Sequence, residues 1–253
     1  IYKLRHKKIG KMTRVSSAGS GWLVRETMPE WMPEAILLLT ALVTLVNWTA
    51  IWRENITAYY VTKPLVLHGL ILYFLIQVPL TPARLPFLIG LIFSLIGDVL
   101  LIPRGTRWFI AGMSAFSLAQ LSYIWGFNIS LPSMPVLFVG VLALMAGVLV
   151  LHLAIDRFAA VSDIKKSLLP FFKGYGVLVL AMAISAVLCL ARPGWSELAA
   201  VFAGIGGILF FVSDAMIGLD KLDRRLPKYK FWIIFTYHLG QFLIVASITR
   251  IIA

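Results

Sequence analysis

The stretch that decides the fold is Pro86-Phe-Leu-Ile-Gly90-Leu-Ile-Phe-Ser-Leu-Ile-Gly97-Asp98-Val-Leu-Leu-Ile102. It is apolar except for Ser94 and Asp98, and its length suits a helix that crosses about 30 Å of hydrocarbon at about 1.5 Å per residue. An ionised carboxylate at such a depth costs several kcal/mol, so intramembrane acids usually serve a function. The stretch therefore predicts a membrane helix that carries a functional aspartate.

The composition of the whole chain agrees with this prediction. Of 253 residues, 60% are hydrophobic and 13% are charged, whereas a soluble domain carries about a quarter charged residues. The mean hydropathy is +0.91. The net charge of +12 does not indicate a nucleic-acid partner, because the basic residues flank apolar segments, as they do in membrane proteins. The single cysteine, Cys189, excludes a disulfide framework and a cysteine-based metal site within this sequence.

Seven further apolar segments of similar length predict an all-α, polytopic membrane helix bundle. The eight expected transmembrane helices cover residues 34–52, 59–78, 86–102, 108–128, 135–155, 170–191, 197–218 and 231–252. The connections are short, so successive helices should pack as antiparallel neighbours in one transmembrane domain, residues 34–253. Residues 1–33 are basic and are predicted to form a disordered tail.

Lysine and arginine are distributed unevenly between the two ends of the predicted helices. The odd-numbered loops hold eleven of them, namely Arg53, Arg104, Arg107, Arg157, Lys165, Lys166, Lys221, Arg224, Arg225, Lys228 and Lys230. The other end holds Arg84, Arg192 and Arg250. Because positive loops stay in the cytoplasm, we expect a multi-pass protein of a bacterial plasma membrane with its odd-numbered loops inside. The basic tail favours the opposite orientation, unless the natural chain starts at Met28.

The two halves of the chain share a weak pattern. The matching positions are Gly90–Asp98 with Gly206–Asp214, Tyr59–Lys63 with Leu169–Lys173, and Gln120 with Gln241. The offset is four helices, which is compatible with a 4+4 parallel pseudo-repeat. Chance similarity between apolar helices explains so few matches equally well.

Two acids and a lysine are predicted to lie at one level in the membrane. Asp98 and Asp214 each lie about four residues before the end of a predicted helix, and the two helices run in the same direction. Both carboxyls are therefore expected about 6 Å below the surface formed by the odd-numbered loops. Lys63 enters from the same surface and reaches the same depth. We take Asp98 and Asp214 as the candidate catalytic residues.

Other helices bring polar side chains to the same half of the membrane. Gln120 and Tyr123 share one helical face. Tyr237 and Gln241, one turn apart, share another. The candidate substrate-binding set is Lys63, Gln120, Tyr123, Ser213, Tyr237 and Gln241.

The helices that carry the acids are edged with small residues. These are Gly90, Ser94 and Gly97 in the first helix, and Gly204, Gly207 and Gly218 in the second. Small residues let helix backbones approach closely, so we expect the acids to face a tight bundle interior rather than lipid.

The same residues also have simpler interpretations. Lys63 can extend to the lipid headgroups as an anchor. Gln120 and Gln241 can serve as hydrogen-bond links between helices. The two aspartates can be structural partners of Lys63 or of a loop arginine.

Other site types find little support in the sequence. His238 neighbours the polar set, but the histidines are scattered without the HExxH spacing of a zinc site, so no metal is predicted. No GxSxG, phosphate-binding or dinucleotide motif occurs in the sequence, so no cofactor is predicted.

The motifs, taken together, resemble those of the YhhN family. They are Phe93-Ser-Leu-Ile-Gly-Asp98, Gly112 with Ala115-Phe116, Gln120 and Tyr123, Gly207-Ile-Leu-Phe-Phe-Val-Ser-Asp214, Tyr237 with Gln241, and Thr62-Lys63-Pro64. The resemblance covers roughly residues 35 to 250 and implies eight membrane helices. Its animal members are lysoplasmalogenases, which hydrolyse the vinyl-ether bond of lysoplasmalogens to an aldehyde and a glycerophospho-base. Many members have His in place of Gln120, so a proton-transfer role does not carry over to that position.

An ether hydrolase of this kind is the function that the resemblance implies, with a lysophospholipid substrate and the bilayer as partners. Protonation of the vinyl β-carbon gives an oxocarbenium ion that water captures. This chemistry requires one protonated carboxyl and one carboxylate, as in glycosidases. Burial favours the first form and a nearby lysine favours the second, so Asp98, Asp214 and Lys63 can divide the work, although the sequence does not say which aspartate is the acid.

Two other classes of protein fit the same residues. A proton- or cation-coupled transporter or a lipid-binding protein would use the intramembrane acids as ion sites. A non-catalytic scaffold would need them only for structure.

Overall fold

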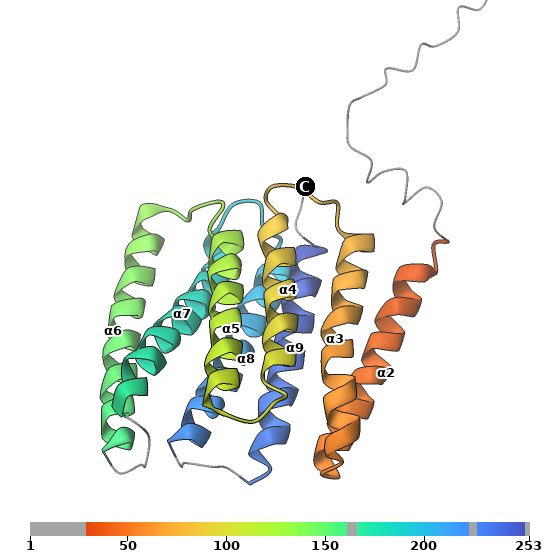
Figure 1. Cartoon of the computed structure of the whole chain (residues 1–253). Helices are drawn as coiled ribbons and strands as arrows, with labels where there is room; N and C mark the ends of the chain where they lie inside the picture. The colour runs from red at the N-terminus through yellow and green to blue at the C-terminus, as the bar shows by residue number, and fades with distance from the viewer. Residues whose placement is uncertain (1–28, 161–165, 223–226, 251–253) are drawn as a thin grey trace, which may run out of the picture.

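The computed structural model describes residues 29–160, 166–222 and 227–250. Over these ranges it consists of eight α-helices and two short 3-10 turns, joined by short connections (Figure 1). The α-helices are α2 (Met32–Trp52), α3 (Ile56–Gln77), α4 (Leu85–Leu100), α5 (Thr106–Phe127), α6 (Met134–Ala159), α7 (Leu169–Val187), α8 (Glu197–Lys221) and α9 (Tyr229–Ile248). The 3-10 turns are η1 (Lys166–Leu168) and η2 (Leu188–Ala191). The all-α fold class and each of the eight expected helices are confirmed.

The ends of the helices follow local sequence signals. Prolines lie in the first turn of α2, α4, α6 and α7, where a missing N–H leaves no intrahelical bond unmade. Asn55 caps α3 by accepting a hydrogen bond from the N–H of Ala58 at 3.1 Å. Ser196 caps α8 by accepting one from the N–H of Ala199 at 3.3 Å. α4 ends two residues earlier than expected, and α8 continues three residues further, to Lys221.

The boundary of the predicted tail needs a small correction. α2 begins at Met32 with Pro33 in its first turn, so these two residues belong to the helical domain. The predicted disorder of the tail concerns residues 1–28, which lie outside the described residues. The loop residues Lys165, Arg224 and Arg225 lie outside them as well.

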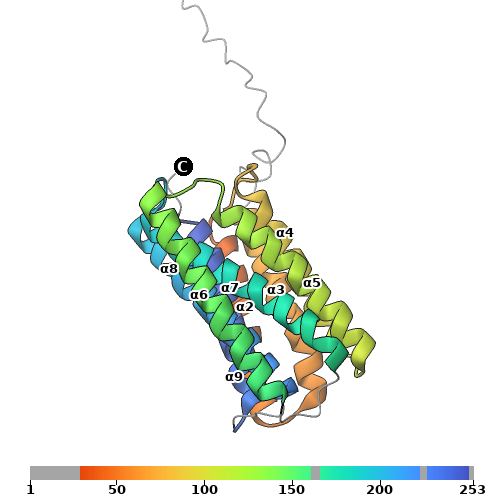
Figure 2. The ribbon, with the colours of Figure 1, turned by 90° about the vertical axis from the view of Figure 1, so that its left-hand side faces the viewer.

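The helices pack mainly as successive hairpins, and α7 and α9 join them. α7 contacts α5, α6 and α8, and α9 contacts α8, α2 and α3 (Figure 2). The connections after α2, α4, α6 and α8 lie at one end of the bundle, the odd-loop face, at the bottom of Figure 1. The last helix of each half thus contacts the second helix of the other half. A parallel pseudo-repeat produces this exchange of contacts.

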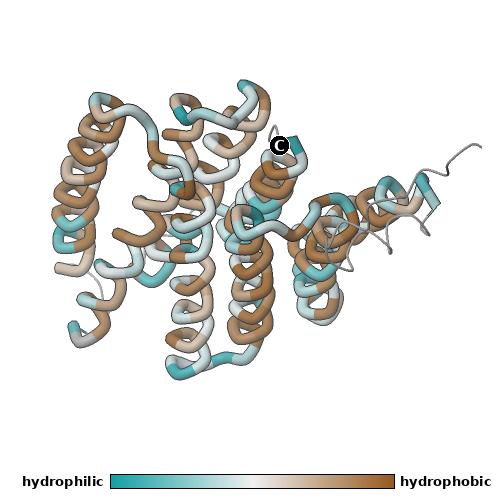
Figure 3. The backbone as a smooth tube through the Cα atoms, turned by 90° about the horizontal axis from the view of Figure 1, so that it is seen from above, coloured by the Kyte–Doolittle hydropathy of each residue, from teal (hydrophilic) through white to brown (hydrophobic). Residues whose placement is uncertain are grey.

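The outer surface of the bundle is apolar. Six helices, α2, α3, α6, α7 extended by η2, α8 and α9, are long and apolar enough to cross a membrane. α6 has a mean hydropathy of 2.7 and is exposed along most of its length, and Figure 3 shows apolar helices at both edges of the bundle. α4, with 16 residues, is shorter. The chain is a multi-pass membrane protein, because only lipid can solvate so much exposed apolar surface.

Small residues bring the inner helices close together, as expected. The ring of Phe116 in α5 packs where a side chain at Gly97 in α4 would lie. Gly207 of α8 packs in the same way against Ala186 of α7. α8 and α9 approach most directly, because a Cβ on Gly240 would lie 2.9 Å from the carbonyl oxygen of Gly206. Backbone contact of this kind is typical of small residues in membrane bundles.

The contact between α8 and α9 can be tested with Gly240→Ala. Its methyl group would press against main-chain atoms of α8 rather than a flexible side chain, so the two helices must separate. We expect the free energy of unfolding in detergent to fall by about 1–3 kcal/mol. Gly174→Ala in α7 is the matched control, because no described residue lies within 4 Å of its added Cβ. Equal stability of the two variants would contradict the close approach.

Candidate functional site

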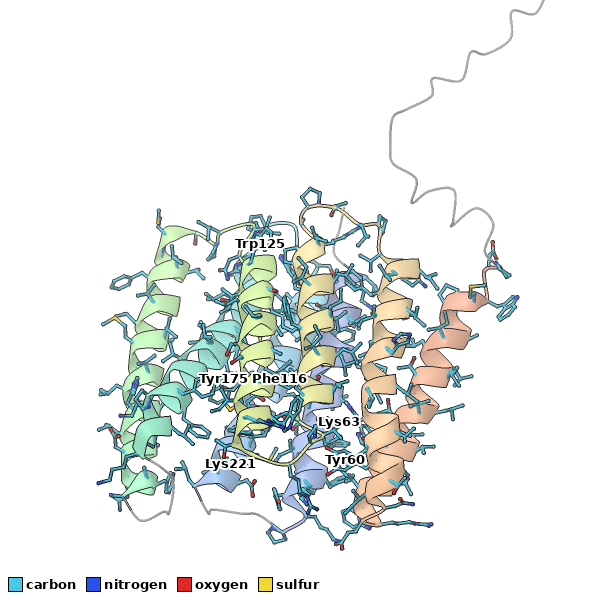
Figure 4. All side chains as sticks on the ribbon, viewed as in Figure 1. Tyr60, Lys63, Phe116, Trp125, Tyr175 and Lys221 are labelled. Atoms are coloured by element: carbon cyan, nitrogen blue, oxygen red, sulfur yellow. The ribbon has the colours of Figure 1, made fainter. Side chains whose placement is uncertain are left out.

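A cavity of about 780 Å³, here called the polar cavity, lies among α2, α3, α4, α5, α8 and α9 and extends to the odd-loop face. Its walls include both predicted catalytic residues, Asp98 and Asp214. Lys63 and Tyr237, which were predicted to lie at the same level, line it too. With Ser213, the structure therefore brings five of the predicted site residues, from four helices, to one cavity. Figure 4 shows Lys63 in the half of the bundle near the odd-loop face.

Asp98 is held by two partners inside the bundle. The ammonium nitrogen of Lys63 lies 3.1 Å from Oδ1 of Asp98. The hydroxyl of Tyr237 donates a hydrogen bond to Oδ2 at 3.0 Å. The Lys63 and Asp98 side chains are 6% and 1% exposed, so Lys63 does not extend to the headgroups as an anchor. The pair compensates two buried charges at once.

Asp214 has a different set of partners. The hydroxyl of Tyr175 donates to its Oδ2 at 2.7 Å, and the amide of Gln120 donates to the same oxygen at 3.3 Å. Among the described residues, Asp214 forms no salt bridge. Its carboxyl is half-buried and lines the polar cavity. The two acids thus share a cavity, but within the described ranges only Asp98 has a cation beside it.

The lysine that aligns with Lys63 in the second half of the chain pairs with a different acid. Lys173 of α7 aligns with Lys63 of α3, but its ammonium nitrogen lies 2.6 Å from Oδ1 of Asp156 on α6. This ion pair is partly exposed, at the outer side of the bundle. The second half of the chain therefore supplies Asp214 with a tyrosine hydroxyl where the first half supplies Asp98 with a lysine.

Three other predicted residues are buried beside the site and do not line its cavity: Gln120, Tyr123 and Gln241. Tyr123 donates a hydrogen bond to Oε1 of Gln241 at 2.7 Å, and the amide of Gln241 donates to Ser94 at 3.0 Å. This series of hydrogen bonds joins α5, α9 and α4 in the buried interior. Gln241 therefore acts as a hydrogen-bond link between helices, one of the two interpretations given for it above. The described residues that line the polar cavity do not include Gln120, Tyr123 or Gln241. A direct contact with substrate stays a prediction for these three residues.

Ser213 and His238 occupy less reactive positions. The hydroxyl of Ser213 donates to the carbonyl oxygen of Ile233 at 2.9 Å, which ties α8 to α9 at the wall of the polar cavity. His238 is fully buried, and neither ring nitrogen has a hydrogen-bond partner within the described part of the chain. It packs beside Tyr237, with ring centroids 5.5 Å apart. Nothing in these contacts gives His238 a place at the cavity.

Two tyrosines of the site were not predicted from the sequence. Tyr175 lies on the second turn of α7 and contacts Asp214 directly. Tyr59 lies four residues before Lys63 on α3 and lines the polar cavity. Both lie near the start of helices that begin at the odd-loop face. The helical-rise argument that placed Lys63 at the level of the acids therefore also applies to them.

The fold and the site define a class: a multi-pass helical membrane protein with two intramembrane carboxyl groups in one cavity. A model of the YhhN family matches residues 58–248. The chain belongs to the YhhN family.

Several relatives have names that state an activity. Lysoplasmalogenase TMEM86A of Bos taurus is 31% identical over 171 residues, which cover 66% of this chain and 66% of that protein. Lysoplasmalogenase TMEM86B of Homo sapiens is 31% identical over 164 residues, 64% of this chain and 62% of that protein. A lysoplasmalogenase homolog of Dictyostelium discoideum is 26% identical over 193 residues, 64% of this chain and 62% of that protein. The chain thus spans slightly under two thirds of the length of these relatives. No solved structure matches the chain.

The ion pair can be tested with Lys63→Met and Asp98→Asn, alone and together. Lys63→Met leaves the Asp98 carboxylate buried without its cation, so we expect the free energy of unfolding to fall by about 3–5 kcal/mol. Adding Asp98→Asn removes that charge and should recover much of the loss. Unfolding of all four proteins in detergent gives the coupling energy of the pair. Strictly additive effects would show that the two side chains do not interact.

Proposed function

We propose that this protein is a membrane-embedded ether hydrolase that cleaves the vinyl-ether bond of lysoplasmalogens, releasing an aldehyde and a glycerophospho-base. The relatives named lysoplasmalogenase support the reaction. The observation that carries the proposal is the pair of unlike carboxyls in one cavity, with Asp98 beside Lys63 and Asp214 beside neutral donors. Vinyl-ether hydrolysis requires such a difference, because one carboxyl must give a proton while the other stays ionised.

The partners of each carboxyl suggest its role. The ammonium group of Lys63 compensates a full negative charge, so Asp98 serves as the carboxylate. Asp214 has a hydroxyl and an amide as partners, which stabilise a charge less than a cation does. Both of these donors use Oδ2. Oδ1 is therefore available to hold a proton that Asp214 can give to the substrate as the general acid.

The proposed reaction balances between these two groups. Asp214 gives its proton to the β-carbon of the vinyl ether, and the electron pair of the double bond forms the new C–H bond. Water then attacks the oxocarbenium carbon while Asp98 takes one of its protons, which gives a hemiacetal. When the hemiacetal collapses, its hydroxyl proton returns to Asp214 and Asp98 protonates the departing glycerol oxygen. Both carboxyls end in their starting forms, as in other paired-carboxyl hydrolases.

The mouth of the polar cavity suits the phosphate of a lysophospholipid. Four basic side chains of the described residues line the cavity toward the odd-loop face: Arg104, Lys221, Lys228 and Lys230. Lys228 is partly engaged by Glu54, 3.1 Å away. Figure 4 shows Lys221 nearer the odd-loop face than Lys63. Arginine and lysine are the usual partners of a phosphate group, so a headgroup at the mouth would leave the rest of the lipid near the acids.

We also propose that the odd-loop face lies in the cytoplasm of a bacterial cell, with the helices in its plasma membrane. Among the described residues this face carries Arg53, Arg104, Arg107, Arg157, Lys166, Lys221, Lys228 and Lys230. The opposite face carries Arg84, Arg192 and Arg250. Such an excess of positive charge is typical of cytoplasmic loops.

Cysteine labelling in intact cells tests this orientation. Arg84→Cys and Arg104→Cys lie in connections at opposite faces, and the native Cys189 is buried. We expect a membrane-impermeant maleimide to label the cysteine at position 84 and to reach the one at position 104 only after the cells are opened. The reverse pattern would place the odd-loop face outside.

The catalytic roles are tested by Asp98→Asn and Asp214→Asn in the purified protein. Each should lower the rate of aldehyde release from lysoplasmalogen by at least about 100-fold, because asparagine neither gives nor takes the proton. In D2O the wild-type aldehyde should carry one solvent deuterium at the carbon next to the carbonyl. Asp156→Asn is the matched control, since that carboxylate is 56% exposed and forms an ion pair outside the cavity.

Different results would favour the other classes of protein. A transporter would show no aldehyde release but proton-dependent uptake of the lipid into liposomes, and that uptake would be lost in the two cavity variants. Normal aldehyde release by both variants would leave the acids with a structural role alone.

A further inference from the structure

A second pocket, the apolar pocket, lies among α5, α6, α7 and α8. Its volume is about 220 Å³. Its lining is made of leucine, isoleucine, valine, alanine, glycine, methionine and phenylalanine, with two polar side chains, those of Asp214 and Tyr175. This pocket therefore offers one hydrogen-bonding corner and an otherwise hydrocarbon wall, which suits an apolar ligand with a reactive end.

The two cavities meet at Asp214. Five residues line both of them: Leu101, Phe109, Phe116, Asp214 and Ile217. Figure 4 shows Phe116 and Tyr175 at about one level, in the half of the bundle near the odd-loop face. A ligand that occupied both cavities would change from polar to apolar where it passes Asp214.

We propose that the apolar pocket binds the hydrocarbon chain of a single-chain phospholipid whose headgroup lies in the polar cavity. This inference rests on the proposed function, under which the chain is the alkenyl chain of a lysoplasmalogen. The vinyl ether is the group that joins this chain to glycerol, so it lies at the boundary between the polar and apolar parts of the lipid. The structure places Asp214 at the matching boundary between the two cavities.

Gly218 is the residue that leaves room for the chain. It lies one turn after Asp214 on the same face of α8 and lines the apolar pocket. Gly204 and Gly207 of the same helix pack against Val187 and Ala186, respectively, so close packing with α7 accounts for them. A Cβ on Gly218 would meet no atom of the described residues within 4 Å. Close helix packing therefore does not account for glycine at this position. A larger side chain here would instead fill part of the apolar pocket.

The test is Gly218→Leu, with Gly174→Leu as its matched control. Both glycines are helical, and no atom of the described residues lies within 4 Å of an added Cβ, but Gly174 lies on the exposed side of α7. Leucine at position 218 would occupy the pocket, so kcat/KM on a hexadecenyl lysoplasmalogen should fall at least about tenfold. Activity on a butenyl substrate should be kept, because its chain is too short to reach the added side chain. The Gly174→Leu protein should hydrolyse both substrates like the wild type.

Photolabelling gives a readout that does not depend on turnover. The probe is a saturated alkyl lysophospholipid with a diazirine in its chain, which lacks the vinyl-ether bond. We expect wild-type and Gly174→Leu proteins to be labelled at the pocket walls, in residues 151–158 and 215–222, and Gly218→Leu to be labelled there several-fold less.

The two hypotheses fail in different ways. If Gly218→Leu hydrolyses long and short substrates like the wild type and is labelled equally, the apolar pocket does not hold the chain, although the hydrolase proposal stands. If the wild type releases no aldehyde but its labelling still depends on position 218, the chain site stands and the hydrolase proposal fails.

Discussion

Lys63 and Asp98 lie 3.1 Å apart inside a bundle whose outer surface is apolar. In such a medium neither charge is tolerated alone, so each requires a partner that reaches it from another helix. This requirement joins α3 to α4, and the hydroxyl of Tyr237 extends it to α9. The polar cavity forms where these helices meet α8 near the odd-loop face. The site is thus built around the compensation of one buried carboxylate.

The chemistry proposed for the site depends on a difference between its two carboxyl groups. Asp98 and Asp214 occupy corresponding helices, and the last helix of each half contacts the second helix of the other. A strict repeat would give both acids a lysine. Lys173 instead pairs with Asp156 at the outer side, and Tyr175 takes the place beside Asp214. Two carboxyls with unlike partners can hold different protonation states, which acid–base catalysis requires.

Glycine serves two separate purposes in the helices that carry the acids. Gly97 and Gly207 allow neighbouring helices to approach, and this close packing seats Phe116 among Gly97, Phe210 and Tyr237. At Gly218 no neighbour from the described part of the chain approaches, and the missing side chain leaves space beside Asp214. The polar cavity and the apolar pocket meet at this acid because α8 packs tightly at Gly207, before Asp214, and loosely at Gly218, after it.

The sequence by itself determined the eight helices and their alternating directions, and it predicted a common depth for Asp98, Asp214, Lys63 and Tyr237. Hydropathy and helical rise are properties of a single segment in a bilayer of fixed thickness, so they give position along the membrane normal. Tertiary structure decided which side chains meet at that depth: Tyr175 beside Asp214, Ser213 bonded to Ile233, and Gly218 facing a pocket. These contacts depend on how each helix is rotated and which helix lies beside it. The rotation of a helix and the choice of its neighbour are both set by side chains of other segments, so neither can be read from the residues of one segment alone.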